Sequence, residues 1–421
     1  MDRAVLAVTV ALAAAGLAVI LTQSPASRLS SDFTINYSAG VLVRQGHLAA
    51  PYHQGELSAV MQRVAPDGAI DPRLPFSLPL AAALPYALLS LLPLELAFRV
   101  CQLLSAALML IALLLLQRGA PTLPSPNVSN ARMALKRRSR GPTGPASGGE
   151  KLEGLPARGG GRYIGLAVLG VLAAVPAWGA FTEGQPTAWL LLGAAMIVLA
   201  LRSDSPALAA GAAMLLAVKP QYLPVYLTIL FAARRWRSLG AAAAGGAVVL
   251  LSPLAGGAGG LEAMVRNALS ANQAVAIRLN EAWIGVIGPA LPTRVATMVA
   301  IALYLAVLLA LCWLAWRRPP SVIGFAALAG ALAVLASPHA LPHDLLILVV
   351  PAWLAIVLYR QGGLPNPLPA LLAIDLAVLI DLRGIDIALG PIVMTAIVAW
   401  YGWQFRRRAE RQRRPPIRRA A

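Results

Sequence analysis

Ionisable residues stand beside apolar runs at a few points of this sequence, where their types allow chemistry. Asp32 is the only charge in SSDFTINYSAG, and Lys219 is the only one of three lysines that lies within an apolar region. The stretch SPHALPHD holds His339, His343 and Asp344. A carboxylate can act as a general base towards a hydroxyl group, and ammonium and imidazole groups can stabilise the charge of a phosphate.

The composition places these residues in a membrane protein. Hydrophobic residues make up 58% of the 421 and charged residues 12%, whereas soluble domains carry about 25% charged residues. The mean hydropathy is +0.71, and apolar runs of about 20 residues recur along the chain, as membrane-spanning helices require. Cys101 and Cys312 lie in apolar runs and indicate neither a disulfide framework nor a thiolate metal site. Ionisable residues at membrane depth are costly and usually functional.

Each candidate residue also has a simpler explanation. Lys219 can extend its ammonium group to the membrane surface while its stem stays among apolar residues. His339 and His343 are four residues apart, a spacing that binds a metal ion on a helix, but Pro342 interrupts a helix between them. A pair of polar side chains that faces a substrate phosphate explains this stretch better. Glu183 lies in the turn TEGQPT, where it is either solvated or functional.

The net charge of +18 reports topology rather than a nucleic-acid partner. Residues 118–162 hold nine Arg and Lys against two Glu, and residues 405–421 hold eight Arg against one Glu. Basic residues beside apolar spans mark the cytoplasmic side of a membrane, where they also contact anionic lipid headgroups. The sequence has no Gly-rich nucleotide-binding loop, Walker motif, Ser-His-Asp signature or HExxH motif.

Residues 4–21 form the first apolar run, which we interpret as a retained helix because MDR before it has no net positive charge. Residues 74–93 are short and contain Pro79 and Pro85, and a stronger run follows at 94–117. If both crossed the membrane, the two basic segments would lie on opposite sides. We therefore expect 74–93 to lie at the interface. The segment before it has an apolar stripe typical of an interfacial helix, formed by Leu57, Val60, Met61 and Val64.

The chain is therefore predicted to be all-α and polytopic, with about twelve transmembrane helices and both termini in the cytoplasm. Residues 1–117 hold the first two helices and the catalytic external loop 22–93. Residues 118–162 have no hydrophobic periodicity and form a disordered basic cytoplasmic insertion. Residues 163–404 hold the other helices, and residues 405–421 form a basic cytoplasmic tail. The other predicted spans are 163–180, 187–201, 205–218, 221–233, 239–258, 293–316, 321–336, 342–359, 365–381 and 387–404.

An ordered set of segments resembles glycosyltransferase family 87, the polyprenyl-phosphate-mannose-dependent mannosyltransferases of the class C membrane glycosyltransferase superfamily. The resemblance covers most of the chain outside residues 119–161. The matching segments are DFTINYSAG, PYHQGEL, PFSLPLAAALPYALLSLLP, GQPT, AAGAAMLLAVKPQYLPVYLTILFAARRWRSL, NQAVAIRL and SPHALPHDLLILVVPAWL.

The resemblance implies that Asp32 is the catalytic base and that the interfacial helices of the first external loop cover the active site. Lys219 corresponds to the lysine of the family's Lys-Pro segment, and His343 to the first histidine of its S-P-x-S-W-x-H-H motif. This chain departs from the family at Asn36, often a tyrosine, at SLPL, often Tyr-Pro-Pro-Leu, and at Asp344, a second histidine. The residues expected to bind substrates are Lys219, His343, Tyr37, Gln185 and Gln221.

The implied reaction transfers a sugar, in this family mannose, from a polyprenyl-phosphate donor to a glycolipid or cell-envelope glycan acceptor, with inversion. We expect a multi-pass protein of the cell membrane, the plasma membrane in bacteria, with its active site on the extracytoplasmic side. The expected partners are the donor, the acceptor and the lipid bilayer, without nucleic acid. No cofactor is expected, although a divalent metal ion remains an option.

Two other classes of protein compete with this interpretation. A lipid or sugar transporter or flippase often shows inverted repeats and broken helices near the membrane midplane, whereas this sequence shows no repeat and its polar residues gather towards one face. A non-catalytic membrane scaffold would leave the external ionisable residues without a role. The sequence therefore favours the enzyme over both alternatives.

Overall fold

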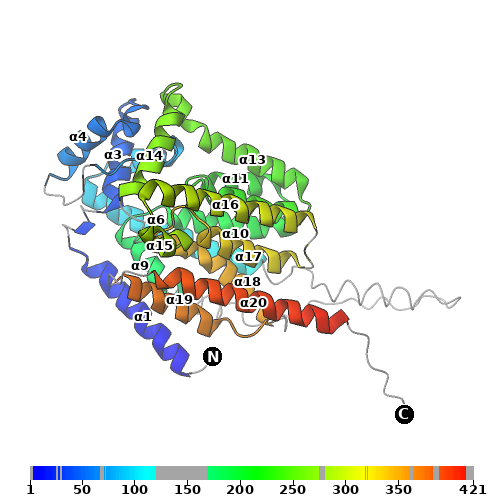
Figure 1. Ribbon diagram of the computed structural model, residues 1–421. Coiled ribbons are helices and arrows are strands. Elements are labelled where there is room, and N and C mark those ends of the chain that lie inside the picture. The colour runs from blue at the N-terminus through cyan, green and yellow to red at the C-terminus, as the bar shows by residue number, and fades with distance from the viewer. Residues whose placement is uncertain are drawn as a thin grey trace, which may run out of the picture.

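The computed structural model of the protein describes residues 3–413, apart from 25–26, 29–30, 67–70, 72, 120–167, 275–279, 318, 320, 361–363 and 383–387. All the secondary-structure elements in this part of the chain are helical. Long helices run side by side in a bundle, and a smaller group formed by α3 (Asp32–Arg44), α4 (Gln54–Val64) and α14 (Gly260–Ala274) lies at one end of it (Figure 1). The predicted all-α class is confirmed.

Most of the helices predicted from the apolar runs are present in the bundle. Its α-helices are α1 (Arg3–Thr22), α6 (Leu94–Gly119), α9 (Val175–Thr182), α10 (Thr187–Ser203), α11 (Pro206–Leu216), α12 (Leu223–Ala232), α13 (Trp236–Leu250), α16 (Thr293–Trp316), α17 (Val322–Leu335), α18 (Val349–Arg360), α19 (Leu368–Asp381) and α20 (Leu389–Arg413). Short elements join them: η1 (Ala50–Tyr52), η2 (Leu80–Ala83), α5 (Leu84–Leu89), η3 (Ser252–Gly256), α15 (Trp283–Ile287), η4 (Gly288–Ala290) and η5 (Pro342–Leu348).

Four helices in the described part of the chain are long and apolar enough to cross a membrane: Leu94–Gly119, Trp236–Gly256, Thr293–Trp316 and Pro342–Arg360. The same part of the chain also holds shorter apolar helices of 10–17 residues. The protein is therefore a helical membrane protein, and the count of twelve spans stays a prediction.

Local sequence signals set several helix ends. Ser205 precedes α11 and its hydroxyl accepts a hydrogen bond from the backbone of Leu208, 3.3 Å away. Ser321 does the same for Gly324 at the start of α17, at 3.1 Å. Such N-cap side chains satisfy amide groups that the helix leaves without partners. Pro220 follows α11 and cannot continue it, which leaves Lys219 between two helices.

The loops between the helices gather at the two ends of the bundle. At one end lie the turn after α9, the segment after α11 and the loop after α17, and the contacts described below connect them to the start of α3. At the other end, Arg202 donates to the carbonyl group of Arg118, and Arg234 donates to the carbonyl group of Trp316 over 2.8 Å. The second end also holds Arg317 and is basic, as the positive-inside rule predicts for a cytoplasmic end.

This arrangement predicts the sidedness of the protein. Reporter fusions at residue 140 and at the C-terminus should both report the cytoplasm, and fusions near residues 60 and 340 should both report the outside. Residues 60 and 340 lie in segments that the structure brings to one end of the bundle, so a result that places them on opposite sides of the membrane would contradict the fold.

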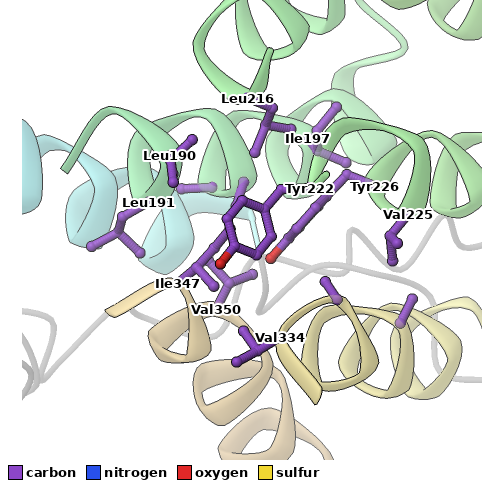
Figure 2. Close-up of a cluster of buried hydrophobic side chains, with 14 of the residues drawn as sticks. Leu190, Leu191, Ile197, Leu216, Tyr222, Val225, Tyr226, Val334, Ile347 and Val350 are labelled. Carbon is purple, nitrogen blue, oxygen red and sulfur yellow. The ribbon is translucent and has the colours of Figure 1, made fainter. Parts of the chain in front are cut away.

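A continuous apolar core holds the bundle together. Tyr222 and Tyr226 of the α12 segment are fully buried, and Figure 2 shows their rings side by side between Leu216 on one side and Val350 on the other. Tyr222 comes three residues after Lys219, so its burial fixes the segment that carries the lysine. Burial of a large apolar side chain contributes about 1.5–3 kcal/mol.

The structure differs from the expectation for α4, and it describes only part of the predicted insertion and of the predicted tail. The stripe on α4 does not face lipid, because Leu57, Val60 and Met61 are buried in a second core with α3 and Phe76. The predicted insertion 118–162 lies outside the described residues except for Arg118 and Gly119, which end α6. Helix α20 continues through the first nine residues of the predicted tail to Arg413.

The region 74–93 does not form a spanning helix. It folds into η2 and α5, which together cover ten residues, and α5 packs directly on α3, where Gly40 leaves room for the backbone of Tyr86. A Cβ atom at Gly40 would come within 2.4 Å of the Tyr86 carbonyl carbon. A helix of ten residues rises about 15 Å, which is half of a bilayer core. Because α12 is equally short, length alone does not decide the matter, and the expectation that this segment lies at the interface stays a prediction.

Candidate active site

Asp32 is the first residue of α3, and its carboxylate faces the turn that joins α9 to α10. Gln185 of that turn donates a hydrogen bond from Nε2 to Oδ2 of Asp32. Burial raises the pKa of the Asp32 carboxyl group, and the positive charge of Lys219 and the bond from Gln185 offset part of this rise. A carboxylate with a raised pKa is a better base towards a hydroxyl group.

Aromatic side chains hold the helix of Asp32 from behind. The Phe33 ring is fully buried, and its centroid lies 5.8 Å from that of Tyr86 and 5.2 Å from that of Phe98, both in edge-on arrangements. Such aromatic pairs add about 0.5–1.5 kcal/mol beyond their buried area. The first turn of α3 is thus fixed on one side, and Asp32 is directed to the other.

The turn after α9 is fitted to α3. The backbone amide of Phe33 donates to the carbonyl oxygen of Glu183 at 3.0 Å, and Tyr86 donates to the carbonyl oxygen of Gly184 at 3.3 Å. Gly184 has a φ of +59°, and a Cβ atom there would lie 2.8 Å from Cβ of Phe33, so only glycine fits. This close fit sets the position of Gln185 beside Asp32.

Lys219, His343 and Asp344 form a second cluster. The Lys219 side chain is buried, its ammonium group contacts Oδ1 of Asp344, and Nε2 of His343 lies 3.4 Å from Nζ. The other oxygen of Asp344 accepts the backbone amide of Leu341 at 3.2 Å, at the start of η5. A buried charge is stable only beside an opposite charge. Asp344 therefore balances Lys219, and both positions depend on the loop before η5.

That loop, residues 337–341, is held by two other segments. Gln221 donates to the carbonyl oxygen of His339 at 3.1 Å, and the Asn280 side-chain oxygen accepts the backbone amide of Ala340 at 3.2 Å. The amide of Glu281 donates to the carbonyl oxygen of Ala340 at 2.7 Å. Burial lowers the pKa of His339 to about 4, so its ring is neutral at pH 7 and can donate or accept a hydrogen bond.

Helix α9 connects the two clusters. His343 packs against Gly179, where a Cβ atom would lie 3.3 Å from Cβ of the histidine. One helical turn later the amide of Glu183 bonds to the carbonyl oxygen of Gly179 at 2.9 Å, and the chain enters the turn that contacts Asp32. The charges of Lys219 and Asp344 both act on the carboxyl group of Asp32. The carboxylate and the ammonium group therefore belong to one site.

The structure gives different places to the other residues expected to bind substrates. Gln185 contacts Asp32, and Gln221 holds the loop 337–341 through its side chain. Tyr37 is buried in α3, and its hydroxyl group donates to the carbonyl oxygen of Leu92 at 2.8 Å. Its contacts lie within the packing around α3, whereas those of Asp32, Lys219 and His343 meet at the site.

Some residues that shape the site have no clear signal in the sequence. Asn280 and Glu281 fall in a segment before α15 that carries no motif, and their contacts with residue 340 arise only in the folded chain. Gln102 of α6 donates to the carbonyl oxygen of Phe181 at 3.0 Å and supports the end of α9. A buried polar residue inside an apolar run, such as Gln102, is the one signal that could have indicated a partner.

A metal site was one interpretation of His339, His343 and Asp344. In the part of the chain that the structure describes, no three His, Cys, Asp or Glu side chains lie together as metal ligands would. Asp344 and His343 instead share contacts with the Lys219 ammonium group.

Comparison with known proteins identifies the family of this chain. Residues 76–338 match glycosyltransferase family 87, and a search of curated proteins found no match. The matched range is more than half of the chain and includes Gln185, Lys219 and Gln221, while Asp32 and His343 lie outside it. With apolar helices around a buried polar site, the match shows that the chain is a membrane glycosyltransferase and belongs to glycosyltransferase family 87.

Proposed function

We propose that the protein transfers a sugar, mannose by its family resemblance, from a polyprenyl-phosphate donor to a glycolipid or glycan acceptor on the extracytoplasmic side of the membrane. The observation that carries this proposal is the pairing of a partly buried carboxylate, Asp32, with a buried ammonium group, Lys219, at the non-basic end of the bundle. A base and a cation in one site suit the attack of a hydroxyl group and the departure of a phosphate.

The transfer step can be written with these residues. The acceptor hydroxyl oxygen forms a bond to the anomeric carbon while Asp32 takes the hydroxyl proton. The bond from that carbon to the phosphate oxygen breaks, through an oxocarbenium-like state with the two oxygens on opposite faces, so the configuration inverts. The released polyprenyl phosphate takes the electron pair. Lys219 and His343 would stabilise its negative charge, and Asp344 holds the ammonium group in place.

Two observations support a lipid-linked donor over a nucleotide sugar. The site lies at the end opposite Arg118, Arg202 and Arg317, and nucleotide sugars are made and kept in the cytosol. A cavity of about 470 Å³ with a mostly apolar lining lies between α17, α18, α19 and α20. It extends from Arg317 at the basic end to Leu335 and Leu348, which border the loop and turn that carry His343. Its position and lining suit the hydrocarbon chain of a lipid donor.

The donor is tested with purified protein and an extracted lipid acceptor. Radiolabelled polyprenyl-phosphate mannose should give labelled acceptor, and GDP-mannose without polyprenyl phosphate should give none. Transfer from GDP-mannose alone would refute the lipid-linked donor. Polyprenyl-phosphate glucose serves as the matched control for the sugar, and transfer of glucose only would correct the assignment of mannose.

A further inference from the structure

Glu183 caps the helix of the proposed base from a distant part of the chain. Ser31 stands at the N-cap of α3 but its side chain makes no capping hydrogen bond. Glu183 instead accepts two amides of the first turn, Asp32 through Oε2 at 3.4 Å and Phe33 through its carbonyl oxygen at 3.0 Å. A negative charge at a helix N-terminus is stabilised by the helix dipole. One function of Glu183 is therefore to fix α3 to the turn that carries Gln185.

The same contact places two carboxyl groups side by side. Burial raises the pKa of Glu183 to about 7, and the charge of Asp32 adds to this rise. The other ionisable groups that act on Asp32 are Lys219 and Asp344, and Tyr86 faces it from α5. The two carboxyl groups are coupled, so their protons belong to the pair rather than to one residue.

We propose that Glu183 is a positioning residue that sets the basicity of Asp32. This inference rests on the proposed role of Asp32 as the base. When Glu183 is ionised, its negative charge makes the Asp32 carboxylate hold a proton more strongly, and a stronger base takes the acceptor proton more readily. The hydrogen bond from the Asp32 amide keeps the Glu183 carboxylate beside Asp32 while Asp32 gains and loses its proton.

Glu183→Gln removes the negative charge but keeps the cap of α3, because the side-chain oxygen of Gln can still accept a hydrogen bond from the Asp32 amide. The charge of Asp32 raises the pKa of Glu183, so Asp32 loses its proton first and Glu183 ionises near pH 7, above the pKa of Asp32. The wild-type pH profile of kcat/KM should therefore rise a second time near pH 7, where the charge of Glu183 makes Asp32 a stronger base. Glu183→Gln should lack this second rise, which leaves its plateau about threefold to tenfold lower. The thermal melting temperature should change little, and Glu183→Asp should restore part of the second rise.

Glu262→Gln is the control, because it removes an exposed carboxylate that pairs with Arg266 at the same end of the bundle and should leave the pH profile unchanged. If Glu183→Gln does not accumulate, Glu183→Ala removes the same charge while the backbone carbonyl oxygen of residue 183 still accepts the Phe33 amide. A second rise near pH 7 that persists in the charge-free variant would overturn the inference. Asp32→Asn, measured in parallel, separates the two claims: if it stays active, the proposed base is wrong, and if it is inactive while the second rise persists in Glu183→Gln, only the role of Glu183 is wrong.

Discussion

Replacing Asp32 with Asn should lower the rate of sugar transfer by about two to four orders of magnitude, the usual contribution of a positioned base. Asn has nearly the same size, so the first turn of α3 and its contact with Gln185 can remain. The amide cannot take the acceptor proton. The loss should therefore appear in kcat, measured with saturating lipid donor on equal amounts of purified protein, while binding of the donor changes little.

Asp71→Asn provides the matched control for this variant. Asp71 also lies in the loop between α1 and α6, but it forms an exposed ion pair with Arg73 over 2.9 Å, and exposed pairs contribute little. Transfer by Asp71→Asn should match the wild-type rate. If Asp32→Asn retained near-normal turnover while inserting correctly, Asp32 would have a structural role, and the base would have to be sought elsewhere in the site.

The sequence predicts most helices because their signals are local. The predicted spans 187–201 and 293–316 correspond to α10 and α16, whose observed bounds differ from them by at most two residues. Apolar length and the positions of prolines set such elements without reference to the rest of the chain. The region predicted as one span, 163–180, contains helical residues 168–173 and then α9, because the chain leaves the helix at Ala174 before Pro176.

The sequence does not predict which surface an apolar stripe contacts. The stripe on α4 fits a lipid-facing helix and a protein-facing helix equally well, because hydropathy records the residue type and not its neighbour. In the folded chain Leu57 and Met61 are buried in the core around α3. The loop between α1 and α6 thus holds a small packed unit, and this packing gives Asp32 a rigid support.

At the site, too, the sequence indicates the types of residue but not their partners. Asp32, Lys219 and His343 were identifiable because charged or polar side chains are rare beside apolar runs. Their partners were not, since Gln185 is 153 residues from Asp32 and Asp344 is 125 residues from Lys219. The first pair depends on the fit of the turn after α9 to α3, the second on the contact of the segment after α11 with η5, and the packing of α9 against η5 links the two. The structure places Gln185 beside Asp32, and its expected role in substrate binding stays a prediction.

The Lys219–Asp344 pair also changes what a single substitution at Lys219 would mean. Asp344 is fully buried, so Lys219→Ala leaves its carboxylate without a counter-charge. Breaking a buried ion pair in this way costs about 3–5 kcal/mol, which should lower the melting temperature in detergent as well as the transfer rate. Loss of activity in this variant would therefore not distinguish a misfolded site from the absence of a phosphate-binding cation.

The double variant Lys219→Met, Asp344→Asn resolves this ambiguity. It removes both charges while keeping similar volumes, and replacing a buried pair by neutral groups is often neutral or stabilising. The melting temperature should return close to that of the wild type. Transfer should remain at least about a hundredfold lower, because no cation is left to stabilise the departing phosphate.

The matched control is Arg235→Met, Asp204→Asn, which removes an ion pair of 3.0 Å at the opposite end of the bundle. Both of its side chains are partly exposed, so stability and transfer should change little. Recovery of transfer together with stability in the Lys219, Asp344 double variant would show that the buried pair only supports the fold. In that case the charge of the leaving phosphate must be met by other groups of the site, of which His343 is the nearest to Lys219.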